Sequence, residues 1–275
     1  MKIDAHQHFW QFDPVRDAWI DEKSMSAIRR DFMPSDLSSI LYRNGINGCV
    51  VVQADQSEKE TTFLIGLAAK YDFIKGVVGW TDIKDNLLAD RLDYFSQYKV
   101  LKGFRHILQG EKAEFMIALN FIDGLRLLGK KGFTYDILVF PGHLKAVRLL
   151  IKELDSQALV IDHMAKPYIK KGLIKEWAKD IKAIARHKNV YCKLSGIVTE
   201  ADWKNWKTSD FTPYLDVVFE AFGTERLMYG SDWPVCLLAA EYDIQLNVIK
   251  DYVSKYAQGS EAKVFGENAI RFYNL

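Results

Sequence analysis

The sequence predicts a (β/α)8 barrel, and three observations support this fold class. Eight short apolar stretches with the composition of buried parallel strands alternate with stretches that carry apolar residues at helical spacing. The chain has 275 residues, a common size for such a barrel, and no Pro/Gly/Ser-rich linker divides it. Ionisable residues gather at the ends of the apolar stretches, where a barrel places its functional groups. We therefore expect a single domain spanning residues 1–275.

The first predicted strand begins at Ile3 and contains His6 and His8. The other seven strands are expected at residues 47–54, 73–80, 100–106, 133–139, 158–163, 189–195 and 226–231. Residues 9–33 have no clear period, and we expect either a long loop that forms a lid or short helices over one end of the barrel. An open doubly wound sheet is the competing architecture, but its glycine-rich first turn is missing after the first strand. The barrel is favoured.

Start and stop signals predict the helix ends. Pro34 and Ser35 should open the first main helix, and Asn44-Gly45 should end it. After the seventh strand, we expect Thr212 as the N-cap, Pro213 in the first turn and Gly223 just past the last turn.

The composition excludes several classes of protein. Hydrophobic residues make up 49% of the chain, so it is not disordered, and 37 basic residues against 36 acidic ones give no electrostatic support for a nucleic-acid or anionic-membrane partner. No apolar run has the length of a membrane span, and polar residues interrupt the position of a signal peptide. The three cysteines, without a C-x-x-C pair, fit a reducing compartment. We expect a soluble, cytoplasmic protein.

The predicted strand ends hold a concentration of ionisable side chains that includes four of the six histidines. These residues are His6, His8, Arg105, His106, Asp136, Asp162, His163, Lys193 and Asp232. Because carboxyl ends of parallel strands share one edge of a barrel, most of them should converge on one site.

His6 and His8 should share one face of the first strand, because side chains alternate along a strand. Two imidazoles aimed one way suit a metal ion or a polarised substrate, although they could instead lie on a solvated edge. Closure of the barrel would bring Asp232, at the end of the last strand, opposite both rings. Its carboxylate could bind a metal, take a proton from water, or cap the following loop.

Three further positions leave alternatives open. His163 could complete a metal site, polarise a carbonyl or be a hydrogen-bonded core residue; its neighbour Asp162 should point the opposite way. Lys193 lies within a strand, where it needs an ion-pair partner or a role in stabilising an oxyanion. Arg105 and His106 are adjacent, so only one should point into the barrel unless a bulge reorients them.

Three tryptophans follow directly on predicted strands: Trp10, Trp80 and Trp233. Flat apolar rings at a barrel mouth can bind the faces of sugars, or they can simply pack at the rim.

Taken together, five motifs resemble the amidohydrolase superfamily, specifically the amidohydrolase-2 group of sugar lactonases. These are Asp4-Ala5-His6-Gln7-His8-Phe9-Trp10, Lys102-Gly103-Phe104-Arg105-His106, Asp162-His163 with Lys166-Pro167, Lys193-Leu194-Ser195-Gly196 with Thr199-Glu200, and Gly230-Ser231-Asp232-Trp233-Pro234-Val235. They span nearly the whole chain. The resemblance implies a hydrolase that opens a sugar-acid lactone of the L-fucono- or L-rhamnono-lactone type.

The resemblance also implies the site residues. His6, His8, His163 and Asp232 match active-site positions and would hold one divalent metal such as Zn²⁺, although members of this group can work without one. Asp136 replaces a metal-binding histidine of the wider superfamily on the fifth strand, which argues against two metals. We expect Asp232 to act as general base and Arg105, His163 or Lys193 to stabilise the oxyanion. A protonated group would then return a proton to the departing ring hydroxyl. His106 is a further catalytic candidate.

Two alternatives remain at this point. A pyrone-dicarboxylate lactonase or an aromatic-acid decarboxylase would need several arginines, and the strand ends offer only Arg105 with Lys193 in support. A non-catalytic sugar-binding barrel should have a damaged site, yet no expected acid or histidine is missing. The sequence leaves the sugar, its ring size and the oligomeric state open.

Overall fold

A computed structural model describes all residues, 1–275, and contains one sheet of eight parallel strands in chain order. The strands are β1 (Ile3–Gln7), β2 (Gly48–Val52), β3 (Ile74–Gly79), β4 (Leu101–Ile107), β5 (Thr134–Leu138), β6 (Leu159–Ile161), β7 (Val190–Leu194) and β8 (Leu227–Tyr229). Each expected strand is present: β1 begins at Ile3 as predicted, and the ends of the other seven strands lie within two residues of the predicted limits. The predicted (β/α)8 barrel is confirmed.

The ring closes between the first strand and the segment just after the last. The Asp232 amide donates to the His6 carbonyl (2.8 Å), and the His8 amide donates to the Trp233 carbonyl (2.7 Å). Asp4 adds a side-chain bond, because its Oδ1 accepts from the Ser231 amide at 2.9 Å. These bonds tie the ends of β1 and β8 together, so the two ends of the chain build one site.

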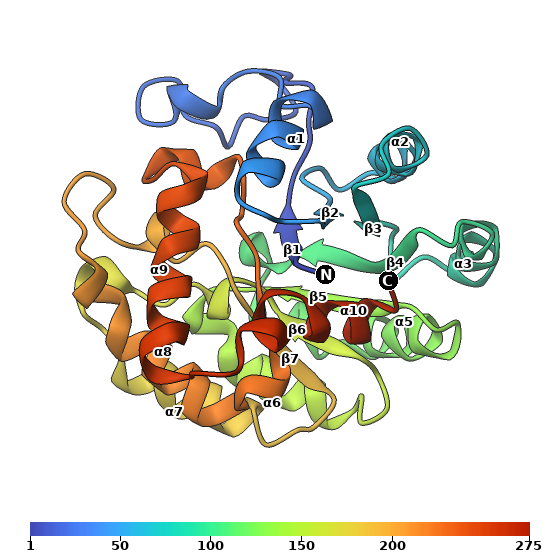
Figure 1. Cartoon of the computed structure of the whole chain (residues 1–275). Helices are drawn as coiled ribbons and strands as arrows, with labels where there is room; N and C mark the ends of the chain where they lie inside the picture. Colours follow the sequence, from blue (N-terminus) through green and yellow to red (C-terminus); the bar gives the residue numbers. More distant parts are fainter.

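Helices form an outer layer around the strands (Figure 1). They are α1 (Pro34–Arg43), α2 (Glu58–Ala68), α3 (Leu88–Ser96), α4 (Ala113–Met116), α5 (Leu119–Lys130), α6 (Leu144–Lys152), α7 (Lys175–Ile184), α8 (Thr208–Phe222), α9 (Tyr242–Tyr256) and α10 (Asn268–Tyr273). The predicted limits of α1 hold: it begins at Pro34 and ends before Asn44-Gly45. Residues 9–33 form a loop with one short 3-10 helix, Ser26–Ile28, and a bridge between Trp10 and Phe32.

The predicted start of α8 is wrong. The helix begins at Thr208, one turn before Thr212, and Pro213 lies inside it. The Asp210 side chain accepts a hydrogen bond from the Lys207 amide at 2.8 Å, which supplies the N-terminal cap. Proline within the second turn removes only one backbone bond, so the earlier cap determines where the helix begins. Gly223 ends α8 with φ +64°, as predicted.

The core has two layers. A large cluster fills the space between the strands and the outer helices, and a smaller one lies within the barrel. Ala269, Phe272 and Tyr273 of α10 pack into the smaller cluster and close the amino end of the barrel. Figure 1 shows both chain termini near the centre of the ring. The opposite, carboxyl end of the barrel stays open for a site.

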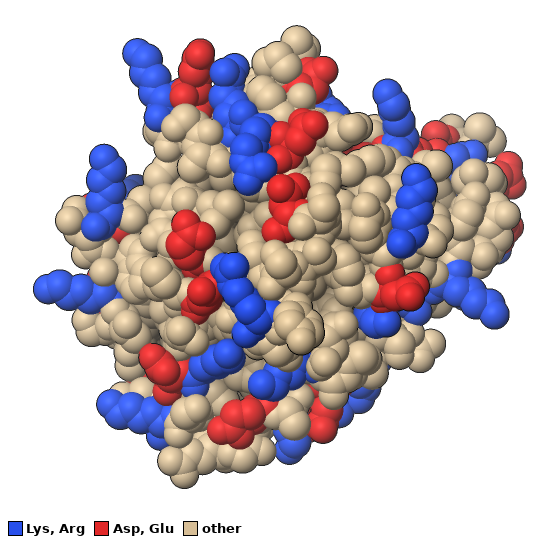
Figure 2. Space-filling view, turned by 45° about the horizontal axis from the view of Figure 1, so that its top comes forward, with Lys and Arg blue, Asp and Glu red and all other residues tan.

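No helix has both the length and the apolar character that a transmembrane segment requires. On the face shown in Figure 2, acidic and basic side chains are interspersed over the surface.

Candidate active site

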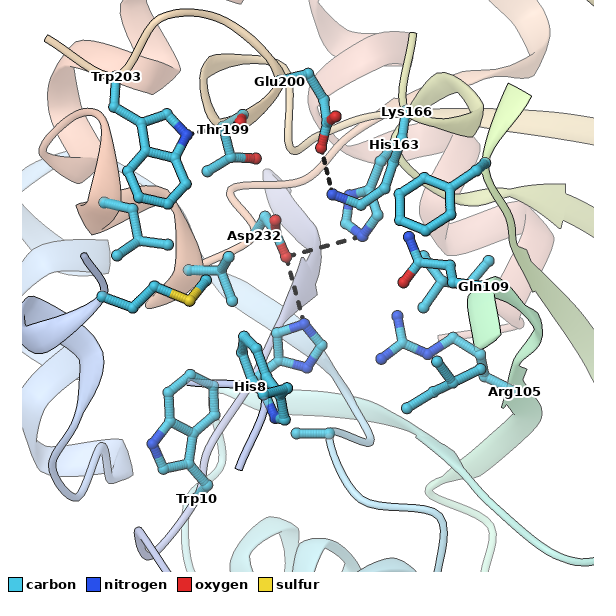
Figure 3. A pocket seen from close by; sticks show the side chains of 18 residues that line it. His8, Trp10, Arg105, Gln109, His163, Lys166, Thr199, Glu200, Trp203 and Asp232 are labelled. Carbon is cyan, nitrogen blue, oxygen red and sulfur yellow. Dashed lines mark hydrogen bonds and ion pairs between the residues drawn. The ribbon is translucent and has the colours of Figure 1, made fainter. Parts of the chain in front are cut away.

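The main cavity lies at the carboxyl end of the barrel and has a volume of about 440 Å³. Loops that follow seven of the eight strands, all except β3, contribute side chains to it. Its lining includes His8, Arg105, His163 and Asp232 among the predicted residues. Trp10, Trp203 and Arg105 surround the central pair of Asp232 and His8 in Figure 3. The predicted convergence of strand ends is therefore present.

Asp232 meets three imidazoles. Its Oδ1 lies 3.3 Å from His8 Nε2 and 3.8 Å from both His6 Nε2 and His163 Nε2. His6 lies in β1 and His8 is the first residue after it, so the strand ends earlier than predicted, yet the two Nε2 atoms lie 3.3 Å from each other. All four side chains are buried.

The hydrogen bonds around the rings fix where their lone pairs point. His8 Nδ1 lies 2.7 Å from the Val52 carbonyl, which can only accept, so Nδ1 carries the proton and Nε2 has the lone pair. Arg105 Nη1, which can only donate, lies 3.3 Å from His6 Nε2, so this nitrogen also has a lone pair. Two lone pairs that face each other across 3.3 Å call for a cation or a proton between them.

This cluster fits a divalent metal. The ligand atoms of His6, His8 and Asp232 all lie within 4.8 Å of one another. Two nitrogens bound to a tetrahedral zinc are separated by about 3.3 Å, the spacing that His6 and His8 have. Burial lowers the pKa of His6 and of His163 well below the ordinary value, and neutral imidazole is the form that binds a metal.

The backbone of Asp232 holds its carboxylate in place. The residue has φ +57°, a left-handed conformation that asparagine and aspartate tolerate better than most residues. Burial raises the pKa of the carboxyl, but His163, His8 and Lys166 outweigh it, and the net pKa lies below its ordinary value. Asp232 is therefore ionised at neutral pH and available as a ligand or a base.

A turn of left-handed backbone follows β6 and carries His163. Four consecutive residues, His163 to Lys166, have φ between 49° and 58°, and the Lys166 amide closes the turn on the His163 carbonyl at 2.8 Å. Each such non-glycine residue costs about 1–2 kcal/mol, so the surrounding structure must hold the turn. Trp177 Nε1 does so by donating to the Met164 carbonyl at 2.8 Å. The turn aims His163 and Lys166 at the same cavity.

A buried charge network lies beneath the cavity. Lys193 Nζ contacts Asp136 Oδ2 (2.5 Å), Asp162 Oδ1 (3.0 Å) and His6 Nδ1 (3.1 Å). Arg105 Nη1 pairs with Asp162 Oδ2 at 3.0 Å. The two cations and two carboxylates balance each other, so of the two roles considered for Lys193 the structure supports the ion pair. Lys193 is fully buried and does not line the cavity, which corrects its predicted catalytic position. Asp162, expected to point away, belongs to the site because the strand ends before it.

His106 and Trp80 lie outside the cavity. Arg105 faces inward, so alternation along β4 turns His106 outward, where it stacks on Phe115 and lies 3.3 Å from Glu111 Oε1. Trp80 Nε1 donates to His106 Nδ1 at 3.3 Å. The predictions of a catalytic His106 and a substrate-binding Trp80 are corrected accordingly.

Of the other two predicted tryptophans, Trp10 lines the cavity and Trp233 does not. Trp233 is 1% exposed and packs edge-on against Phe9 and Phe32, because the left-handed turn at Asp232 directs the chain inward. Sequence reasoning missed Trp19 and Trp203, which do line the cavity. Both lie in loops without periodicity, so no pattern indicated where their rings would point.

Four polar lining residues were also missed: Gln109, Lys166, Thr199 and Glu200. Lys166 and Glu200 form an ion pair across two loops (Figure 3). The signal that could have found Lys166, Thr199 and Glu200 is their place in the Lys166-Pro167 and Thr199-Glu200 motifs, which follow two site-forming strands.

Comparisons with known proteins show which family the chain belongs to. The Amidohydrolase family model matches residues 3–275. A Burkholderia multivorans L-fucono-1,5-lactonase is 36% identical over 100% of this chain and 96% of its own length. A Scheffersomyces stipitis L-rhamnono-gamma-lactonase is 22% identical over 96% of this chain and 86% of its own length.

A crystal structure of a Burkholderia multivorans amidohydrolase with bound zinc superimposes with a TM-score of 0.96 at 35% identity, and covers 100% of this chain and 99% of the other. The match of the family model to nearly the whole chain, together with a full-length relative above one-third identity, shows that the chain belongs to the amidohydrolase family.

Proposed function

We propose that this protein hydrolyses the ester bond of a sugar-acid lactone, of the type that L-fucono-1,5-lactonases open. The proposal rests on one arrangement: an ionised carboxylate, Asp232, held against three imidazoles at the cavity at the carboxyl end of the barrel. That constellation suits activation of water beside a carbonyl. The full-length similarity to a lactonase supports the choice of substrate.

In the proposed mechanism Asp232 accepts a proton from a water, whose oxygen attacks the lactone carbonyl. Its lowered pKa makes it a weak base that is always ionised near neutral pH. The ring carbon–oxygen bond then breaks, and the protonated Asp232 returns the proton to the departing alkoxide. His6, His8 and Asp232 would hold a divalent metal, with His163 close by, and such a metal lowers the pKa of a bound water.

Arg105 is the proposed oxyanion-stabilising residue. It lines the cavity, and its Nη1 is oriented by Asp162 at 3.0 Å. A guanidinium fixed in this way donates to developing negative charge without reorganising during the reaction. His163 Nδ1 lies 2.8 Å from Ser195 Oγ, which leaves Nε2 facing Asp232 and the reacting atoms.

The loop at residues 9–33 supplies one wall of the proposed substrate site through Trp10, Trp19 and Met25. We propose that it covers a bound lactone as a lid. Trp10, Trp19 and Trp203 offer flat apolar surfaces for the faces of a sugar ring. We further propose that the whole chain, 1–275, acts as one domain around this cavity.

The rival substrates within the fold fit the cavity less well. A pyrone dicarboxylate or an aromatic acid carries one or more carboxylates that need free cations. The cavity offers Arg105 and Lys166, and Lys166 is already paired with Glu200. A neutral, hydroxyl-rich lactone is therefore the better match. A purely sugar-binding barrel does not explain why the acid and all three imidazoles meet.

The test is a lactone screen with a pH indicator, because each opened ester releases one proton at neutral pH. We expect turnover of L-fucono-1,5-lactone or L-rhamnono-γ-lactone by the wild type, measured with and without a chelator. Acceptance of several carboxylated pyrones but no aldonolactone would overturn the proposed substrate class. Asp232→Asn, analysed in parallel, controls for spontaneous ring opening.

A further inference from the structure

Two charged side chains in the cavity wall take no direct part in the proposed proton transfer, although Lys166 helps to lower the pKa of Asp232. Lys166 and Glu200 form an ion pair in which each side chain is only 16% exposed. Both line the cavity, and Figure 3 shows the pair beside His163 and Asp232. Ion pairs that serve stability alone are more often found on exposed surfaces, so a largely buried pair that lines a cavity calls for an explanation.

The chain holds both partners firmly. Lys166 ends the left-handed turn that begins at His163, and its amide donates to the His163 carbonyl at 2.8 Å. The turn has 3-10 geometry, with three residues per helical turn, so two residues three positions apart lie on the same side. This is why His163 and Lys166 both reach the cavity.

Glu200 lies in a 3-10 turn, Val198–Glu200, directly after β7. Thr199 Oγ1 donates to the Gly196 carbonyl at 2.9 Å, and Trp203 Nε1 donates to the Thr199 carbonyl at 2.8 Å. These bonds fix the segment that presents the carboxylate to the cavity.

The pair has unused hydrogen-bonding capacity. An ammonium group has three donors, and the structure records one bond from Lys166 Nζ, to Glu200 Oε1. No hydrogen bond reaches Glu200 Oε2. The same cavity is also lined by apolar side chains such as Leu138, Phe140 and Leu238, which cannot satisfy these groups. A ligand with both acceptors and donors on adjacent atoms would do so.

We propose that the Lys166–Glu200 pair binds two neighbouring hydroxyl groups of the lactone. Each hydroxyl oxygen can accept from the ammonium and each hydroxyl hydrogen can be donated to the carboxylate, so a vicinal diol matches the pair on both sides. A cavity built in this way discriminates against lactones without hydroxyls, because the remaining donors of Lys166 and the Oε2 atom of Glu200 are then left without partners. This inference rests on the proposed lactonase function and adds the feature of the substrate that is recognised.

The test compares two lactones with the same six-membered ester ring, only one of which carries hydroxyls. L-Fucono-1,5-lactone carries them, and δ-valerolactone has the same six-membered ring without them. We expect Lys166→Met and Glu200→Gln each to lower kcat/KM for the hydroxylated lactone by about ten- to a hundredfold, the range for hydrogen bonds to charged groups. For δ-valerolactone the loss should stay below about threefold. The double variant should lose less than the product of the two single losses.

Controls separate recognition from folding. Lys182→Met removes an ion pair with Glu220 that is distant from the cavity and exposed, and both substrates should keep their wild-type rates. Glu200→Gln has nearly the same shape as the wild-type residue, so it remains informative even where Lys166→Met fails to fold. An equal loss for both lactones, or no loss for either, overturns the proposal, because a structural or catalytic role would not distinguish them.

A binding measurement makes the test independent of turnover. Trp10, Trp19 and Trp203 line the cavity and report occupancy by fluorescence. We expect the open-chain acid of the hydroxylated lactone to bind the wild type more tightly than 5-hydroxypentanoate, and both variants to lose that difference. Absence of turnover of any aldonolactone would reject the proposed function, whereas an unchanged preference in the variants would reject only the diol site.

Discussion

Lys193 Nζ lies 3.0 Å from Asp162 Oδ1, and both side chains are fully buried beneath the cavity. The same ammonium contacts Asp136, which also accepts from Tyr273 of the C-terminal helix α10 at 2.8 Å. A line of polar contacts thus connects the floor of the barrel with His6. Burial raises the pKa of Asp162, but Lys193, His6 and Arg105 outweigh it and keep this carboxyl ionised.

Lys193→Met should therefore destabilise the protein strongly. Removing one partner leaves two carboxylates buried without their shared cation, and such losses cost about 3–5 kcal/mol. The free energy of unfolding in urea measures the effect. Lys182→Met, at an exposed pair, should change it by less than about 1 kcal/mol. Similar stabilities for the two variants would show that the buried network contributes no more than a surface ion pair.

Asp232→Asn should remove activity while leaving the fold intact. Asparagine keeps the shape and tolerates the left-handed φ of +57°, but it cannot accept a proton from water at neutral pH. General-base catalysis accounts for about 10²- to 10⁴-fold in rate, and we expect kcat to fall within that range or further. Initial rates of lactone opening and an unfolding curve give the two readouts. Near-wild-type turnover in this variant would remove Asp232 as the base.

The meeting of His6, His8 and Asp232 was predictable because it depends only on strand order and barrel closure. Two features of the site were not predictable. The left-handed turn from His163 to Lys166 contains no glycine, so no local signal announced it, and without it Lys166 would not reach the cavity. Trp233 follows a strand as Trp10 does, but its ring packs against Phe9 and Phe32 and does not line the cavity. Tertiary packing determines the backbone conformation of this turn and the direction of the Trp233 ring, and the pattern of a single sequence does not reveal tertiary packing.

Zinc should stabilise the protein through His6, His8 and Asp232. A ligand that binds only the folded state at a hundredfold excess over its Kd raises the free energy of unfolding by about 2.7 kcal/mol. We expect a chelator to lower the thermal midpoint of wild type purified with metal, and added Zn²⁺ to restore it. His8→Ala should abolish the zinc-dependent shift, whereas His143→Ala, outside the cavity, should keep it. A full shift in the His8 variant would place the metal elsewhere.

Glu60 should make stability depend on pH. Its carboxyl accepts from the Ala54 amide at 2.9 Å and from the Asp55 amide, and burial raises its pKa from 4.5 to about 7 against these bonds. With a raised pKa, the folded state holds a proton that the unfolded state has already lost. The contribution of Glu60 is therefore fully present below pH 4.5 and declines as pH rises to about 7.

Glu60→Gln isolates this effect. Between pH 4.5 and 7, the stability of wild type relative to the variant should fall by an amount on the order of 2–3 kcal/mol, whatever constant offset the amide introduces. Urea unfolding at several pH values measures it. A difference that stays flat from pH 4.5 to 7 would show that folding does not raise the pKa of the Glu60 carboxyl.

Ala165→Gly should cost little stability, although Ala165 is fully buried. Its φ of +58° costs an alanine about 1–2 kcal/mol, and glycine escapes this cost. Against that gain stand the lost methyl group, about 0.8 kcal/mol, and the greater freedom of glycine in the unfolded chain, about 0.5–1 kcal/mol. The sum lies within about 1 kcal/mol of zero.

Ala146→Gly provides the matched comparison, because Ala146 is also buried but lies in the right-handed helix α6. There no strain is relieved, and the two losses add to about 2 kcal/mol. Urea unfolding of both variants measures the contrast. If Ala165→Gly proved as costly as Ala146→Gly, the left-handed turn would not be strained, and the surrounding contacts would not be needed to hold His163 and Lys166 against the cavity.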